Sequence, residues 1–304
     1  MSTVQQPGGV RGAVYDRGYR PYDGPRGGRR AATFGLYKAT LRRALGIRRP
    51  WQQKVAPFVL LAVVTVPAMV DVGIGYVTRD RTQDRFSIIT YRGYVGVSSA
   101  LLLFVALIAP DIICPDRRQR VLSLMFARPL TGTDYVLAKF GAMVTILFSF
   151  SFLPQVVLFV GQTLVADGAL DYVRDNADVV WKVPAAIVIM AVYYSVVGLA
   201  FSAITSRRIV AGATIIGFFL VTSVVSLIVV GDNVDGVTQS SAATLLNLYA
   251  LPLQLRDLVF LGHIDPASTL HGVANGGAYA VLVYLAVVAT GATVLIGRYR
   301  WAER

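Results

Sequence analysis

The sequence predicts an all-α integral membrane protein with six transmembrane helices and with both termini in the cytoplasm. Hydrophobic residues make up 55% of the 304 residues and charged residues only 15%, and the mean hydropathy is positive. A soluble domain of this length cannot bury so much apolar surface. Six segments reach the roughly 20 apolar residues that one crossing of a bilayer requires. The predicted spans are 55–77, 94–113, 140–165, 183–204, 209–230 and 276–296.

The charge distribution gives the predicted orientation, because Lys and Arg near the ends of membrane helices are retained in the cytoplasm. With both termini inside, 22 of the 29 basic residues are cytoplasmic, and ten of the 17 acidic residues lie in outer loops. The opposite orientation would carry those 22 basic residues across the membrane. We therefore expect a multi-pass protein of the plasma membrane.

The N-terminal residues 1–32 are expected to form a flexible basic arm. They contain seven Gly, three Pro and six Arg, a composition that cannot build a packed core. Tyr15, Tyr19 and Tyr22 alternate with Arg17 and Arg20, which on a soluble protein would indicate nucleic-acid binding. Beside an anionic leaflet the same charges favour lipid headgroups. We expect contact with membrane lipids or a partner, or simple disorder, and no nucleic acid.

Residues 33–50 follow the spacing of an amphipathic helix that lies in the membrane interface. Its predicted apolar face carries Phe34, Tyr37, Leu41 and Leu45, and its basic face carries Lys38, Arg42 and Arg49. Pro50 ends the helix, and the six-helix domain, residues 51–304, begins with Trp51. No apolar core of a cleavable signal peptide comes before the first span. A basic juxtamembrane helix without a special role is the alternative.

A few polar residues interrupt the spans and are weak candidates for a substrate pathway. A charge inside a membrane is costly, so Asp71 in the first span is a functional candidate, although it lies near the outer surface. Amides and hydroxyls that face lipid are unfavourable, so the others are expected to face a neighbouring helix or a cavity. These are Gln155 and Gln162 in the third span and Tyr193 and Tyr194 in the fourth. Interhelical hydrogen bonds explain them equally well.

The stretch between the second and third spans is basic and amphipathic and predicts a short cytoplasmic helix at about 116–128, after the second span stops at Pro110. Its apolar face at helical spacing consists of Val121, Leu122, Met125 and Phe126. Asp116, Arg117 and Arg118 begin it, Arg128 and Pro129 end it, and Tyr135 and Lys139 follow. The lone Cys114 just before it has no partner for an internal disulfide and is expected to be inert.

The order Arg128-Pro129, Tyr135, Lys139 resembles the cytoplasmic loop of the ABC-2 family of transporter permeases. The resemblance implies a coupling helix at 116–128 that docks on a separate nucleotide-binding ATPase, with Asp116 where many relatives have a glutamate. It also implies that 33–50 is the elbow helix, that 240–262 forms re-entrant external helices before the last span, and that the protein lies in a bacterial inner membrane. In the 240–262 segment, two short helices are expected to meet at Pro252.

The resemblance implies a function as well. The chain is expected to be the permease subunit of a type V-like ABC exporter, which dimerises with an identical or homologous permease. ATP and Mg would then bind to the partner ATPase, and this chain would hold no cofactor. Reversing Arg117 and Arg118 to Glu is expected to abolish transport and to leave membrane insertion intact.

Enzymatic activity is not expected in this chain. A phosphate-binding loop of the form G-x-x-x-x-G-K-[ST] is impossible, since the sequence contains no Gly-Lys pair. Glu303 is its one glutamate, which excludes an H-E-x-x-H zinc site, and no G-x-S-x-G motif occurs. His263 and His271 match no metal motif. Two alternatives to the exporter stay open: a membrane anchor or signalling partner of a cytoplasmic ATPase that transports nothing, and a secondary transporter.

Overall fold

The computed structural model describes residues 27–46, 52–78, 89–95, 98–119, 130–230 and 241–303. These residues form helices and connections without a strand, and six of the helices are long and apolar enough to cross a membrane. The predicted all-α class and its six long apolar helices are confirmed. The six are α2 (Gln52–Thr78), α4 (Ser98–Arg118), α6 (Gly132–Val165), α8 (Val179–Ile204), α9 (Arg208–Val230) and α11 (Gly276–Glu303).

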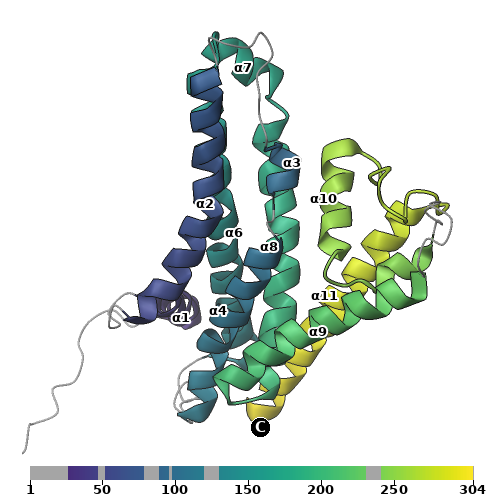
Figure 1. The fold of residues 1–304 in the computed structure, drawn as a ribbon. Coiled ribbons are helices and arrows are strands. Elements are labelled where there is room, and N and C mark those ends of the chain that lie inside the picture. Colours follow the sequence, from purple (N-terminus) through teal and green to yellow (C-terminus); the bar gives the residue numbers. More distant parts are fainter. Residues whose placement is uncertain are drawn as a thin grey trace, which may run out of the picture.

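Five shorter helices complete the described chain, namely α1 (Arg29–Ala44), α3 (Tyr91–Tyr94), α7 (Ala169–Asp175), the 3-10 helix η1 (Ala242–Leu246) and α10 (Leu251–Leu261). Figure 1 shows α1 and the C-terminus at the same end of the molecule and α7 at the opposite end. We call these the α1 end and the α7 end. An even number of long helices returns the chain to the end from which it started.

Helix α8 lies at the centre of the bundle. It packs against α3, α4, α6, α9, α10 and α11. Of the residues in its most apolar 18-residue stretch, 72% are buried inside the protein. The corresponding share is only 22% for α2 and 17% each for α9 and α11. A helix that is apolar all round belongs in a protein core or a membrane, so α2, α9 and α11 present broad apolar faces outward, as expected for helices in contact with lipid.

Glycines allow the helices to approach one another closely, as is usual between membrane helices. A Cβ atom added at Gly161 of α6 would lie 2.4 Å from a methyl group of Val72 on α2. A Cβ at Gly291 of α11 would lie equally close to Val196 of α8. The two helix pairs are therefore in contact at positions where no larger residue fits without movement.

Several of the predicted helix boundaries differ from those of the structure, and two of the differences have a clear physical reason. Helix α4 does not stop at Pro110 but runs through Pro110 and Pro115 to Arg118, because its neighbours α6, α8 and α9 hold it in place beyond these prolines. Helix α6 starts at Gly132 instead of 140, because Thr131 and Asp134 form a capping box there. At 34 residues, α6 is about 51 Å long and is longer than the hydrocarbon core is thick.

Helix α1 also differs in detail from the expected 33–50 helix. It begins at Arg29 and ends at Ala44, and the buried residues on it are Thr40 and Ala44. Phe34, expected on the apolar face, is 64% exposed. Helix α1 packs against α6 and α4, and an exposed Phe34 is compatible with the predicted apolar face toward the membrane interface.

The segment before the last long helix contains two short helices, as the sequence suggested. The two helices do not meet at Pro252, as was predicted: η1 ends at Leu246 and α10 begins at Leu251. Pro252 lies in the first turn of α10, where its missing N–H costs nothing. Gly262 ends α10 with a φ of 76°, a left-handed conformation that favours glycine. Helix α10 lies alongside α8 and α11 (Figure 1).

Candidate functional site

A buried carboxylate joins three helices at the α1 end. Asp116, in the last turn of α4, has a fully buried side chain. Its Oδ1 lies 2.6 Å from the guanidinium of Arg43 on α1, and its Oδ2 lies 2.6 Å from Nζ of Lys139 on α6. The hydroxyl of Tyr135 on α6 donates to the same Oδ2 at 3.0 Å. We call these four residues the Asp116 cluster.

Helical spacing explains how α6 contributes two members of the cluster. Tyr135 and Lys139 are four residues apart and therefore lie on one face of α6. Lys139 also donates to the carbonyl of Ile112 on α4 at 3.0 Å, and its side chain is only 3% exposed. A buried charge is tolerated when it is paired and hydrogen-bonded, and the Lys139 ammonium has both an ion-pair partner and a carbonyl acceptor.

A second ion pair fixes the other end of α1. Arg29 bonds through Nε and Nη2 to the two carboxylate oxygens of Asp134, at 2.6 and 3.0 Å. This two-point geometry is the strongest that an arginine forms with a carboxylate. Between these ends, the hydroxyls of Tyr37 and Thr145 lie 3.0 Å apart. Helix α1 is thus attached near its start, middle and end to the long helices α4 and α6.

A basic hollow of about 1260 Å³ opens at the same end, between the end of α4 and the start of α9. The residues that line it are Asp111, Cys114, Pro115, Arg118, Gln119, Ser206, Arg207, Arg208, Ile209 and Val210. Arg208 forms an ion pair with Asp111 at 2.9 Å, and Arg117 donates to the carbonyl of Ala203. The hollow thus has a surplus of positive charge. Cys114 is buried in its wall.

The predicted coupling residues fall into two groups. Asp116, Tyr135 and Lys139 meet in the Asp116 cluster, and Arg117 and Arg118 end α4 beside the basic hollow. Residues 116–118 therefore belong to α4 and do not begin a separate helix. The remaining predicted coupling residues lie outside the described part of the chain: Val121, Leu122, Met125, Phe126, Arg128 and Pro129.

The candidate pathway residues do not gather at one place but make three separate sets of contacts. Asp71 is 1% exposed, and its carboxylate accepts from Nε2 of Gln162 at 2.8 Å and from the backbone N–H of Ile89 at 3.1 Å. Nε2 of Gln155 points instead at the carbonyl of Tyr91, 3.4 Å away. Two candidates that the sequence treated separately, Asp71 and Gln162, are therefore partners between α2 and α6.

Tyr193 and Tyr194 support the turn between η1 and α10. Their buried hydroxyls donate to the carbonyls of Leu248, at 2.8 Å, and Tyr249, at 3.2 Å. These bonds satisfy backbone groups in a segment without regular helix, which a buried turn requires. In the structure these two tyrosines hold the η1–α10 turn against α8.

Charged residues also form a network at the α7 end. Arg92 of α3 pairs with Asp265 and lies 3.8 Å from Asp257 of α10, which in turn pairs with Arg256 at 2.7 Å. The pKa of Asp265 is lowered, first by the backbone N–H of Ala267 and then by the Arg92 guanidinium. This network joins α3 to α10 and to the loop that follows it.

Both histidines lie in that loop. Nδ1 of His263 and Nδ1 of His271 lie 2.9 and 3.0 Å from the carbonyl of Ile264. A carbonyl only accepts, so each contact is a hydrogen bond in the tautomer that carries the proton on Nδ1. Within the described ranges no three potential ligands group together to hold a metal ion.

Some of these residues were not singled out from the sequence. The capping box at Thr131 and Asp134 has a recognisable local signature and could have been found. No local signature marks the other four residues, because each pairs with a residue more than 70 positions away in the sequence; they are Arg29, Arg43, Arg92 and Asp265.

The sequence matches no protein-family model and no curated protein. The resemblance to ABC-2 permeases therefore gains no support from these comparisons, and it rests on the loop residues and on the order of the elements.

Proposed function

We propose that this chain is the membrane-spanning permease subunit of an ABC exporter in the bacterial inner membrane. In this proposal a separate nucleotide-binding subunit holds ATP and Mg and docks at the α1 end, which faces the cytoplasm. The chain pairs with an identical or homologous permease. Helix α1 is then the elbow helix in the interface, and η1 and α10 are the re-entrant external helices.

The observation that carries the proposal is the Asp116 cluster. Tyr135 and Lys139 of α6 bind the carboxylate of Asp116, which lies 19 residues before Tyr135, together with Arg43 of α1. Helix α4 ends at Arg118 and α6 begins at Gly132, so the loop between these two helices connects the two sides of the cluster along the chain. A subunit that binds this loop would therefore displace α1, α4 and α6 together.

Coupling requires that the ATPase subunit contact this chain differently in its two nucleotide states. A partner can shift the arrangement of the membrane helices only if it binds the loop differently in its ATP and ADP states. The basic hollow offers a second contact beside the loop, because Arg118 and Arg207 line it and would attract an acidic surface of the ATPase.

Site-directed photo-crosslinking tests the docking. A photoreactive residue at Arg118 or Ser206, in the hollow, is expected to capture a subunit that carries a phosphate-binding loop. The same residue at Leu170 of α7, which is 74% exposed at the opposite end, serves as the control and is expected to capture no ATPase. Capture from Leu170 alone, or from neither end, would contradict the proposed docking face.

A membrane anchor without transport is a second candidate, and one observation favours it. Asp71 and Gln162, two candidate pathway residues, are hydrogen-bonded to each other, and Asp71 is buried, which suits a static bundle. Labelling of a cysteine at position 162 by a membrane-impermeant maleimide separates the two candidates. A permease predicts a rate that changes several-fold between the ATP-bound and nucleotide-free complexes, and an anchor predicts the same rate in both.

A further inference from the structure

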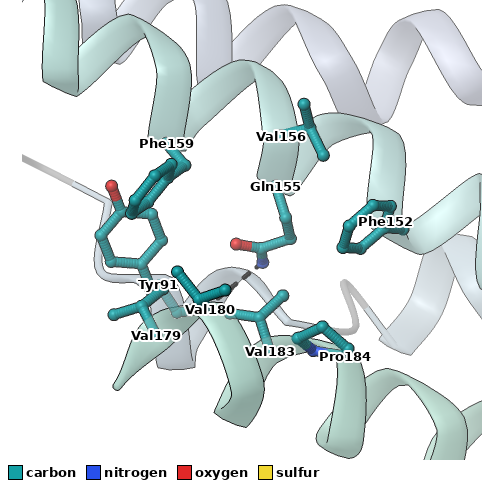
Figure 2. A pocket seen from close by; sticks show the side chains of 9 residues that line it. All are labelled: Tyr91, Phe152, Gln155, Val156, Phe159, Val179, Val180, Val183 and Pro184. Carbon is teal, nitrogen blue, oxygen red and sulfur yellow. Dashed lines mark hydrogen bonds between the residues drawn. The ribbon is translucent and has the colours of Figure 1, made fainter. Parts of the chain in front are cut away.

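A small pocket lies between α6, α8 and α3, toward the α7 end. Its volume is about 170 Å³, and Figure 2 shows the nine side chains that line it. They are Tyr91, Phe152, Gln155, Val156, Phe159, Val179, Val180, Val183 and Pro184. Apart from the Gln155 amide and the Tyr91 hydroxyl, their side chains are apolar, and none carries a charge. We call this the Gln155 pocket.

The amide of Gln155 has an unused acceptor. The side chain is 2% exposed, and its Oε1 has no hydrogen-bond partner among the residues that the structure describes. Buried polar groups are nearly always hydrogen-bonded, so an exception requires a reason. Figure 2 shows this oxygen turned toward the side of the pocket where Tyr91 lies.

The orientation of the amide follows from its surroundings. Nε2 faces the backbone carbonyl of Tyr91 at 3.4 Å, and the reversed amide would set two acceptors against each other. This bond is long, and the terminal torsion of a glutamine is soft. A small turn of the amide therefore presents Oε1 to the pocket with little loss.

Pro184 lines the pocket beside Val180, four residues earlier on α8. Among the described side chains that line the pocket, Oε1 of Gln155 is the buried acceptor without a donor. The Tyr91 hydroxyl is already engaged, since it lies 2.7 Å from that of Tyr172.

The entrance is open to the surroundings of the bundle. Val156 is 41% exposed and Val180 is 59% exposed, one on each side of the pocket. Both lie on helices long and apolar enough to cross a membrane. An apolar molecule dissolved in the bilayer can thus reach the pocket from the side.

We propose that the Gln155 pocket binds a neutral, ring-sized molecule that carries one hydroxyl or N–H donor, such as a phenol. An apolar cavity of about 150 Å³ holds a benzene ring, so the volume suits one ring with a small substituent. The uncharged wall favours a neutral ligand, and Oε1 of Gln155 accepts its proton. This site is independent of the proposed transport function, because it needs neither an ATPase nor a second permease.

Two probes of nearly the same shape test the role of the acceptor. The ligands 4-fluorophenol and 4-fluorotoluene differ in one hydroxyl, and fluorine NMR titrations in lipid nanodiscs measure their saturable binding to the purified chain. Partition into lipid cancels when wild type and variants are compared in the same nanodiscs. The variant Gln155→Leu is expected to bind 4-fluorophenol roughly tenfold more weakly, as the loss of one hydrogen bond implies. It is expected to bind 4-fluorotoluene as wild type does.

A second pair of variants tests the location without changing the amide. Val180→Phe fills the entrance from an exposed position and is expected to abolish saturable binding of both probes. Val188→Phe makes the same change at a position on α8 that is 43% exposed and outside the pocket, and it is expected to bind as wild type. Equal 4-fluorophenol affinity in wild type and Gln155→Leu, unchanged binding in Val180→Phe, or no saturable binding to wild type would each overturn the proposal.

Discussion

The substitution Asp116→Asn removes the charge that holds the Asp116 cluster together while it keeps the size of the side chain. Lys139, with a side chain only 3% exposed, would stay buried without a counter-charge, whereas Arg43, 38% exposed, can turn toward water. Removing one partner of a buried ion pair costs about 3–5 kcal/mol, mostly because the other charge stays buried. We therefore expect Asp116→Asn to lower the free energy of unfolding by about that amount.

The same reasoning ranks the other variants of the cluster. Arg43→Met is expected to cost only about 1 kcal/mol, since a partly exposed arginine contributes little. The double variant Asp116→Asn, Lys139→Met replaces the buried charges by uncharged groups of similar size and is expected to recover most of the loss. Chemical unfolding in mixed micelles, followed by tryptophan fluorescence, measures all three.

Asp178→Asn is the matched control. Asp178 pairs with Lys182 at the same 2.6 Å distance, but its side chain is 51% exposed, so its loss is expected to cost less than about 1 kcal/mol. If Asp116→Asn cost no more than Asp178→Asn, or if Arg43→Met cost as much as Asp116→Asn, the assignment of the buried Lys139 charge as the origin of the effect would be refuted.

Three further predictions concern the rest of the bundle. Tyr193→Phe leaves the buried carbonyl of Leu248 without its donor and is expected to lower the unfolding free energy by about 1 kcal/mol. The same variant is expected to speed hydrogen exchange in the η1–α10 turn, and unchanged exchange there would count against the role of this hydroxyl. Gly161→Ala forces the α2–α6 contact apart and is expected to lower the unfolding free energy by about 1–3 kcal/mol in the same assay. Gly217→Ala is the control: no atom lies within 4 Å of the added carbon, and the substitution is expected to stabilise slightly. Equal effects of the two substitutions would contradict the close approach of α2 and α6. The pKa of Asp265 is lowered below 3.8, so the contribution of this carboxylate to stability is complete above pH 3.8 and is lost as the pH falls through the lowered value. Asp265→Asn should therefore show at neutral pH the faster hydrogen exchange that wild type shows only in acid. A loop that stays protected in this variant would disprove the role of the Asp265 charge.

The long apolar helices could be predicted from the sequence because hydropathy is a local property. A run of about 20 apolar residues is visible without knowing what it touches. The ends of the helices depend on contacts that are not local. Helix α4 continues past Pro110 because other helices surround it, and a proline rule that considers one helix alone misses this.

The Asp116 cluster likewise contains residues that could be singled out from the sequence and contacts that could not. The sequence identified Asp116, Tyr135 and Lys139 by their order in the loop, yet nothing in it indicated that they share one carboxylate. Arg43 was one of 12 basic residues before the first span and had no distinguishing neighbour. Its role depends on α1 lying across the ends of α4 and α6, which is a property of the tertiary structure.

Purification of the tagged chain from its own membranes in mild detergent, with mass spectrometry and an ATPase assay of the product, tests the central claim most directly. The permease proposal predicts that a subunit with a phosphate-binding loop copurifies with the chain, that the complex hydrolyses ATP, and that reversal of Arg118 and Arg207 to Glu removes the subunit. A chain that purifies in a folded state without any ATPase would contradict the proposal.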